Sequence, residues 1–143
     1  MKLIIKILKY GYRKFRIFWN FDFYSSHSSG FFIKNESQKK LGAYNLKYKI
    51  SADYDMFYRM IIKNNMKGTS TKKNEIVGYF KSGSSYSSRF SFYDHLIEET
   101  KIRIDNNQNK LFVFLIFIIH YLKKMEKIKD KSFFKVIKDF FYL

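Results

Sequence analysis

Two carboxylates near the middle of the chain are the residues best suited to chemistry. Asp53 and Asp55 open a predicted amphipathic helix, directly after an approach rich in aromatic and hydroxyl side chains. The positive end of a helix dipole favours negative charge in the first turn. An ionised carboxylate that reaches a substrate hydroxyl there can act as a general base.

Each acid also has a purely structural interpretation. Asp53 is placed to cap the helix, and Asp55 stands four residues before Arg59, the spacing of a surface ion pair on a helix. We favour the ion pair for Asp55 and leave both interpretations open for Asp53. The two acids also have the Asp-x-Asp spacing of a metal-binding element. Such an element belongs in a loop after a strand, so we predict no metal site here.

The pattern of apolar residues predicts a helix-rich chain with a few short strands. The motif helix should cover 52–65, with Met56, Phe57, Met60 and Ile61 on its apolar face. We expect further helices over 2–19, 36–41, 90–106, 111–129 and 132–142, with Gly42 as a C-cap and a break at 106–109. Strands are predicted over 31–33 and 75–80. The Gly/Ser-rich stretch 82–88 is either a lid or a linker.

Four segments between His27 and the serines at 84–88 follow a known order. They are His27-Ser28-Ser29-Gly30-Phe31-Phe32-Ile33-Lys34, Lys40-Leu41-Gly42-Ala43-Tyr44, Tyr48-Lys49-Ile50-Ser51-Ala52-Asp53-Tyr54-Asp55, and Val77-Gly78-Tyr79-Phe80 leading to Gly83. This order resembles the acceptor side of family 2 glycosyltransferases. Two positions depart from the family pattern: Ala43 replaces the second glycine of its turn, and Ala52 replaces a common glutamate.

The resemblance implies roles for particular residues. Asp53 would be the catalytic base that takes the proton of the acceptor hydroxyl, and His27, Tyr54, Arg59 and Gly83 would contact substrate. For His27 a buried histidine bonded to a local loop carbonyl is an equally good interpretation. We interpret His95 as a surface residue and His120 as a residue of an apolar helix face.

The resemblance also implies an architecture. We expect a partial α/β domain of the GT-A type, helix-rich, whose donor-binding half is absent from these residues. The chain would then divide into a basic amphipathic helix and loop (1–26), the acceptor-side region (27–90) and C-terminal helices (91–143). The full enzyme would use a nucleotide sugar, a glycan or lipid-linked acceptor and a divalent metal, Mg²⁺ or Mn²⁺. We expect no cofactor in this chain and no activity without a separate donor-binding half.

The composition limits which other functions are possible. The 143 residues contain no cysteine and carry a formal net charge of +16. Such a charge is typical of proteins that bind nucleic acid or anionic membranes. Lysine far exceeds arginine, and the joint abundance of Lys, Asn, Ile, Phe and Tyr is what an AT-rich coding sequence produces. No nucleic-acid motif surrounds the basic residues, so we predict no nucleic-acid partner. Binding of single strands through lysines and aromatics is the weaker rival.

A membrane surface is the other partner to consider. The most apolar run, 111–122, is far shorter than the roughly 20 residues of a spanning helix, and no secretory signal is evident at the N-terminus. We therefore expect a cytoplasmic protein, peripheral at the inner face of the membrane. The alternative to a glycosyltransferase is a non-catalytic basic amphipathic protein that binds the membrane surface.

Overall fold

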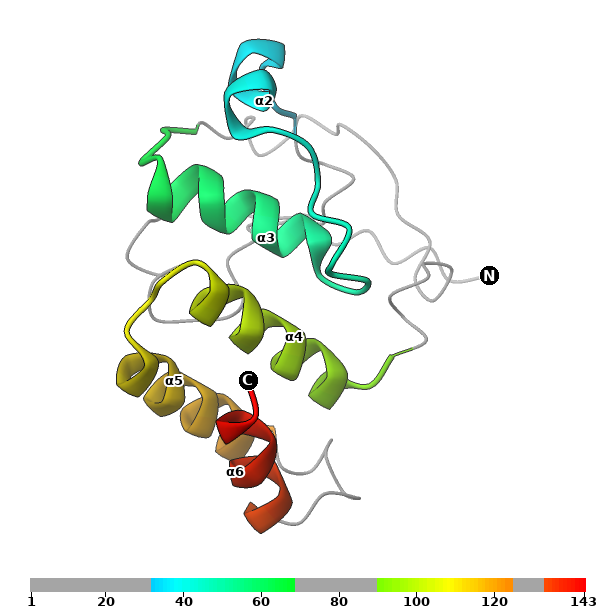
Figure 1. Cartoon of the computed structure of the whole chain (residues 1–143), viewed down its shortest axis with the longest axis vertical. Helices are drawn as coiled ribbons and strands as arrows, with labels where there is room; N and C mark the ends of the chain where they lie inside the picture. The colour runs from blue at the N-terminus through cyan, green and yellow to red at the C-terminus, as the bar shows by residue number, and fades with distance from the viewer. Residues whose placement is uncertain (1–31, 69–89, 125–132) are drawn as a thin grey trace, which may run out of the picture.

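The computed structural model describes residues 32–68, 90–124 and 133–143, which form helices joined by turns (Figure 1). The elements are α2 (Asn35–Leu41), α3 (Ala52–Tyr58), the π-helical turn η2 (Arg59–Lys63), α4 (Phe92–Asp105), α5 (Lys110–Lys123) and α6 (Phe133–Phe141). The predicted helix over 2–19, the strand over 75–80 and the stretch 82–88 lie outside the described residues.

The expected α/β architecture is wrong, because residues 32–68, 90–124 and 133–143 contain helices and no strand. The predicted strand over 31–33 fails for a local reason. Phe32 is 75% exposed and Ile33 is only partly buried, whereas a strand inside a sheet buries its side chains and pairs its backbone with a neighbour. These two residues instead lead directly into α2.

Helix α2 ends as its sequence predicts. Gly42 has a φ of 79°, in the left-handed region that glycine adopts at low cost, and its N–H donates to the carbonyl of Gln38 at 3.0 Å. This confirms Gly42 as the C-cap. The chain can then turn sharply into the connection that leads to α3.

Helix α3 and the turn η2 form one continuous helical segment at the predicted place. Met56, Phe57, Met60 and Ile61 are all buried, as their helical spacing predicts. The last turn widens into a π-helix, in which the backbone N–H of Asn64 donates to the carbonyl of Arg59 at 3.0 Å. This segment ends at Lys63, two residues earlier than predicted.

Helices α4 and α5 form an antiparallel hairpin (Figure 1). A capping box starts α4, because Ser91 and Asp94 each accept the backbone N–H of the other. The predicted break between the helices is confirmed, with Asn107 at a φ of 63°. Asn109 then caps α5 by accepting the N–H of Phe112 at 3.1 Å.

Helix α6 packs on this hairpin through aromatic rings and one partly buried polar contact. The ring of Phe140 lies 4.8 Å from that of Phe114 and 5.4 Å from that of Phe117, centroid to centroid. The hydroxyl of Tyr93 donates to the Asp139 carboxylate at 2.7 Å. Burial, together with this bond to a carboxylate, raises the pKa of Tyr93.

One hydrophobic core runs through the described helices, with α4 between α3 and α5 (Figure 1). Its buried members include Tyr54, Met56 and Phe57 of α3, Leu96 and Ile102 of α4, Val113, Ile116 and Phe117 of α5, and Val136 of α6. Residues on both sides of the predicted boundary between 90 and 91 therefore share a core, while the boundary itself stays a prediction. Within the described residues no helix has both the length and the apolar character to cross a membrane.

Candidate functional site

Asp53 lies in the first turn of α3 and is only partly buried. Its Oδ1 accepts the backbone N–H of Tyr54 at 2.8 Å. Among the described residues no side chain forms a hydrogen bond or ion pair with this carboxylate. The N-cap of α3 is Ser51 and no side chain caps this helix, so Asp53 is not the predicted cap, although it satisfies one backbone N–H of the first turn. The second carboxylate oxygen of Asp53 has no donor in this part of the chain.

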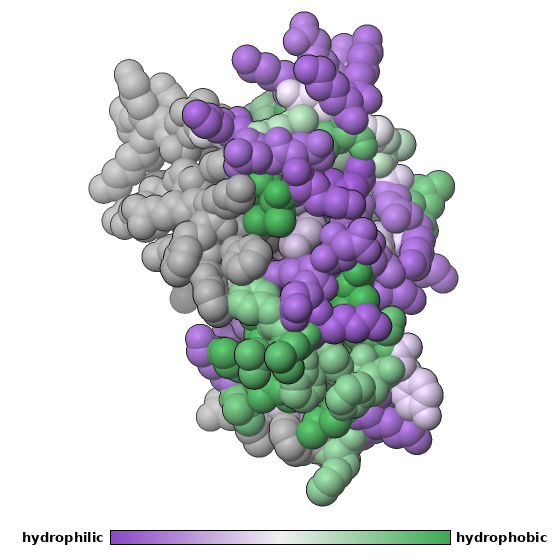
Figure 2. All heavy atoms as spheres, turned by 60° about the vertical axis from the view of Figure 1, so that its left-hand side comes forward, coloured by the Kyte–Doolittle hydropathy of each residue, from purple (hydrophilic) through white to green (hydrophobic). Residues whose placement is uncertain are grey.

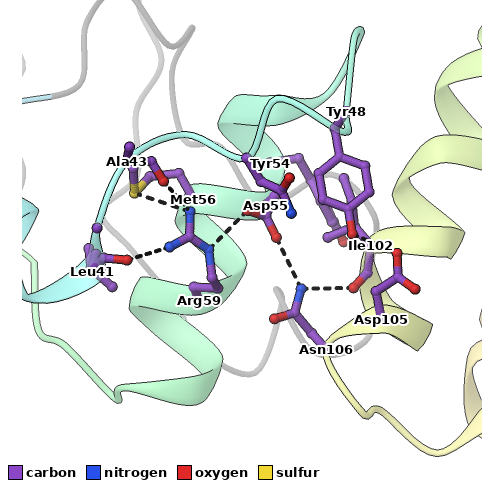
Figure 3. A network of polar contacts seen from close by, with 12 residues as sticks. Leu41, Ala43, Tyr48, Tyr54, Asp55, Met56, Arg59, Ile102, Asp105 and Asn106 are labelled. Atoms are coloured by element: carbon purple, nitrogen blue, oxygen red, sulfur yellow. Dashed lines mark hydrogen bonds and ion pairs between the residues drawn. The ribbon is translucent and has the colours of Figure 1, made fainter.

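Asp55 has the opposite environment. It is 2% exposed, its Oδ2 accepts from Nε of Arg59 at 2.9 Å, and its Oδ1 accepts from the Asn106 amide at 3.1 Å (Figure 3). The predicted ion pair with Arg59 is confirmed. The expectation that it lies on the surface is wrong, because α4 and the connection after α2 cover the carboxylate. Asp55 therefore joins α3 to the end of α4.

Arg59 connects α3 to the end of α2. Besides Asp55, its guanidinium donates to the carbonyl of Leu41 at 2.5 Å and to that of Ala43 at 3.0 Å (Figure 3). Carbonyls at a helix C-terminus attract positive charge. All three guanidinium nitrogens thus have partners within the chain, which favours a structural role over the substrate contact predicted from the resemblance.

Tyr54, the neighbouring predicted substrate residue, is 1% exposed. Its hydroxyl accepts from Nε of Arg103 at 2.7 Å, and the buried Arg103 guanidinium lies 5.9 Å from its ring centroid and 5.7 Å from that of Tyr58. Burial raises the pKa of Tyr54, and the positive charge of Arg103 opposes that shift only in part. This tyrosine lies in the core, where its contacts with Arg103 help to fix the position of α3.

Glu98 organises the approach to α3 and was missed by sequence reasoning. Its carboxylate accepts three successive backbone N–H groups, those of Lys49 at 2.9 Å, Ile50 at 2.7 Å and Ser51 at 2.6 Å. The last of these residues is the N-cap of α3, two positions before Asp53. A carboxylate of α4 therefore holds the turn from which Asp53 projects.

Asp105 anchors the same connection from the far end of α4. It accepts from Nζ of Lys47 and from the hydroxyl of Tyr48, both at 2.7 Å. Partial burial acts to raise the pKa of Asp105, but the two hydrogen bonds outweigh it and lower that pKa below 3.8. Burial and the Asp105 carboxylate raise the pKa of Tyr48. In the sequence, the clustering of acidic residues in the predicted helix over 90–106 is the one signal that could have indicated the contacts of Glu98 and Asp105.

A hollow of about 320 Å³ lies where the end of the α3–η2 segment meets the turn between α4 and α5. Tyr58, Ile62, Lys63, Asn106, Asn107, Gln108, Asn109 and Phe112 line it. Asp53 is not among these residues, and several of the amide side chains already form hydrogen bonds within the protein. The Gln108 carbonyl oxygen, for example, accepts from the hydroxyl of Tyr58 at 3.0 Å and from Arg103 at 3.2 Å.

The remaining predicted site residues, His27 and Gly83, lie outside the described residues. Asp53, Tyr54 and Arg59 share one helical segment, but their side chains do not converge, because Tyr54 binds Arg103 in the core and Arg59 binds Asp55 and the end of α2. In the described part of the chain no three His, Cys, Asp or Glu side chains gather closely enough to hold a metal ion. Comparisons with protein-family models, with curated proteins and with solved structures returned no match. The resemblance to family 2 glycosyltransferases therefore rests on the four ordered segments alone.

Proposed function

We propose that this chain supplies the acceptor side of a glycosyltransferase, with Asp53 as the general base. The observation that carries the proposal is the division between the two acids of the motif. Asp55 is buried and bonded to Arg59 and Asn106, whereas Asp53 is partly exposed and bonded only to a backbone N–H within the described residues. A general base has to be ionised and accessible to the substrate hydroxyl.

The proposed reaction is transfer of a sugar from a nucleotide-sugar donor to a glycan or lipid-linked acceptor. The acceptor hydroxyl oxygen attacks the anomeric carbon while its proton passes to the Asp53 carboxylate, and the nucleoside diphosphate leaves with the electron pair of the broken bond. The donor and its divalent metal would be held by a separate donor-binding half. Because the described residues form helices, we assign the acceptor side to a helical segment and not to an α/β unit.

The surroundings of Asp53 suit this role. Asp53 lies in the first turn of α3, where a helix dipole favours negative charge, and Glu98 and Asp105 hold the connection that leads into the helix. Glu98 binds backbone N–H groups and Asp105 binds the side chains of Lys47 and Tyr48, and neither acid contacts the partly exposed Asp53 carboxylate. A rigid support of this kind is what a catalytic group needs to keep its geometry.

The test is to express the chain together with the donor-binding half of a family 2 glycosyltransferase and to assay sugar transfer. Asp53→Asn should reduce the rate by about 10²–10⁴, the usual contribution of a positioned base, with at most a small decrease in melting temperature. The amide keeps the size of the side chain and can still accept the N–H of Tyr54. Transfer at the wild-type rate by Asp53→Asn would reject the proposal, and robust transfer by the 143-residue chain alone would reject the need for a donor half.

A further inference from the structure

Helix α5 has apolar residues on its exposed side as well as on its buried side. Leu111, Leu115, Ile119 and Leu122, here called the α5 stripe, recur at spacings of four, four and three residues and so lie along one face. Their exposed fractions run from 46% for Ile119 to 69% for Leu111. The opposite face holds the buried residues Val113, Ile116, Phe117 and Tyr121.

The stripe belongs to a wider apolar surface. Figure 2 shows hydrophobic side chains gathered over the lower part of the molecule, where α5 and α6 lie, while hydrophilic ones dominate the upper part. Helix α6 contributes the exposed aromatics Phe134 and Phe141, and Tyr142 directly follows the helix. The ring of Phe141 lies 5.9 Å from that of Phe114 on α5, which connects the apolar residues of the two helices. Exposed apolar surface on this scale is typical of an interaction site.

The charged residues of α5 and of its C-cap are all lysines. Lys110 stands at one end of α5, Lys123 and Lys124 stand at the other, and all three are exposed. Residues 106–124 contain no Asp or Glu. Long lysine side chains can rest their methylene groups on an apolar surface while their ammonium groups reach phosphate. The surface therefore combines apolar insertion with attraction to negative charge.

We infer that the α5 stripe docks on the surface of an anionic phospholipid bilayer, with the helix lying in the plane of the interface. At a rise of 1.5 Å per residue the 14 residues of α5 extend about 21 Å, which is less than the roughly 30 Å of a hydrocarbon core. The leucines enter the boundary between headgroups and acyl chains, and the lysines bind the lipid phosphates.

A second copy of the chain fits this surface less well. If two stripes paired antiparallel about a twofold axis, Lys110 of one copy would face Lys123 and Lys124 of the other, and like charges would meet. Protein–protein interfaces are also depleted in lysine. The anionic bilayer complements both the apolar residues and the lysines. This inference does not rest on the proposed glycosyltransferase activity.

The test is co-sedimentation of the full chain with vesicles of phosphatidylcholine alone or mixed with phosphatidylglycerol. We expect binding to the anionic vesicles that weakens as salt is raised. Leu115→Glu should reduce the partition coefficient about tenfold or more, because a charge replaces an inserted leucine. The matched control is Leu46→Glu, which makes the same change at a 91% exposed leucine outside the stripe and should leave binding unchanged.

A second pair of variants tests the lysines at equal net charge. Replacing Lys123 and Lys124 by Gln should weaken binding to anionic vesicles about tenfold or more, whereas the same change at Lys39 and Lys40 on α2 should have little effect. Equal losses in stripe and control variants, or no vesicle binding by the wild type, would overturn the inference. A wild-type dimer that Leu115→Glu converts to a monomer in sedimentation velocity would assign the stripe to a second copy and also overturn it. None of these measurements involves sugar transfer, so their failure is distinct from failure of the proposed function.

Discussion

At the scale of single residues, Asp53 and Asp55, which are separated by one tyrosine, have different environments. Asp55 is enclosed by protein and neutralised by Arg59, while Asp53 keeps an oxygen without a donor among the described residues. The position of the two acids within one turn of α3 causes this difference. A two-residue step rotates the side chain by about 200° around the helix, so one carboxylate faces α4 and the other does not.

The variant Asp55→Asn should therefore be costly to the fold. Removing one charge from a buried ion pair leaves Arg59 without its counter-ion, and we expect a loss of about 3 kcal/mol in the free energy of unfolding. The measurement is urea unfolding followed by circular dichroism. Asp53→Asn is the matched control, and its loss should stay within about 1 kcal/mol, the value of one capping contact. Equal losses for the two variants would contradict the assigned environments.

At the scale of elements, the connection between α2 and α3 is held by long-range contacts more than by its own conformation. Glu98 accepts three backbone N–H groups from it, and Arg59 donates to the carbonyls of Leu41 and Ala43. Backbone groups in an irregular segment need partners when they are shielded from water. Here α3 and α4 supply those partners, so the start of α3 is positioned by its neighbours.

We expect Glu98→Gln to loosen this connection. The amide offers one acceptor oxygen in place of two and turns a donor toward backbone N–H groups, so the stability loss should be about 1.5–3 kcal/mol, as for bonds to a charged group. Hydrogen exchange of the Lys49, Ile50 and Ser51 amides should become faster. The exposed Glu36→Gln on α2 serves as control. Unchanged exchange at these three amides in the Glu98 variant would show that the carboxylate does not hold the turn.

At the scale of the whole molecule, the stability of the fold should depend on pH through Asp105. Its folded-state pKa lies below its ordinary value of 3.8, so the unfolded chain binds more protons in this range and stability rises with pH. The contribution of Asp105 is complete above about pH 5 and is lost as the pH falls below about 4.

Thermal unfolding between pH 3 and pH 7 checks this prediction. Wild-type protein should lose more stability on acidification than Asp105→Asn, whose side chain does not titrate. Tyr48→Phe removes one of the two donors and should give an intermediate slope. Parallel pH curves for the wild type and Asp105→Asn would show that this carboxylate does not contribute to the acid sensitivity.

The sequence predicted the described helices well because their signals are local, although α5 ends at Lys123 and not at residue 129. The spacing of Met56, Phe57, Met60 and Ile61 defines the buried face of α3, and Gly42 ends α2 since its left-handed φ suits glycine. The partial α/β fold was wrong because it came from the resemblance and from a short apolar run near Phe32. An apolar run of three residues carries no information about whether a neighbouring strand exists.

In the candidate site, too, local contacts could be predicted from the sequence and long-range contacts could not. The sequence by itself determined the contact between Asp55 and Arg59, because four residues span one helical turn. Only the tertiary structure decided that this pair is buried, that Glu98 holds the start of α3 and that Arg103 lies against Tyr54, because those partners stand 47–49 residues apart along the chain. It also decided which side of α5 is exposed. That helix is apolar all round, so its periodicity could not distinguish the face that packs on α4 from the exposed face.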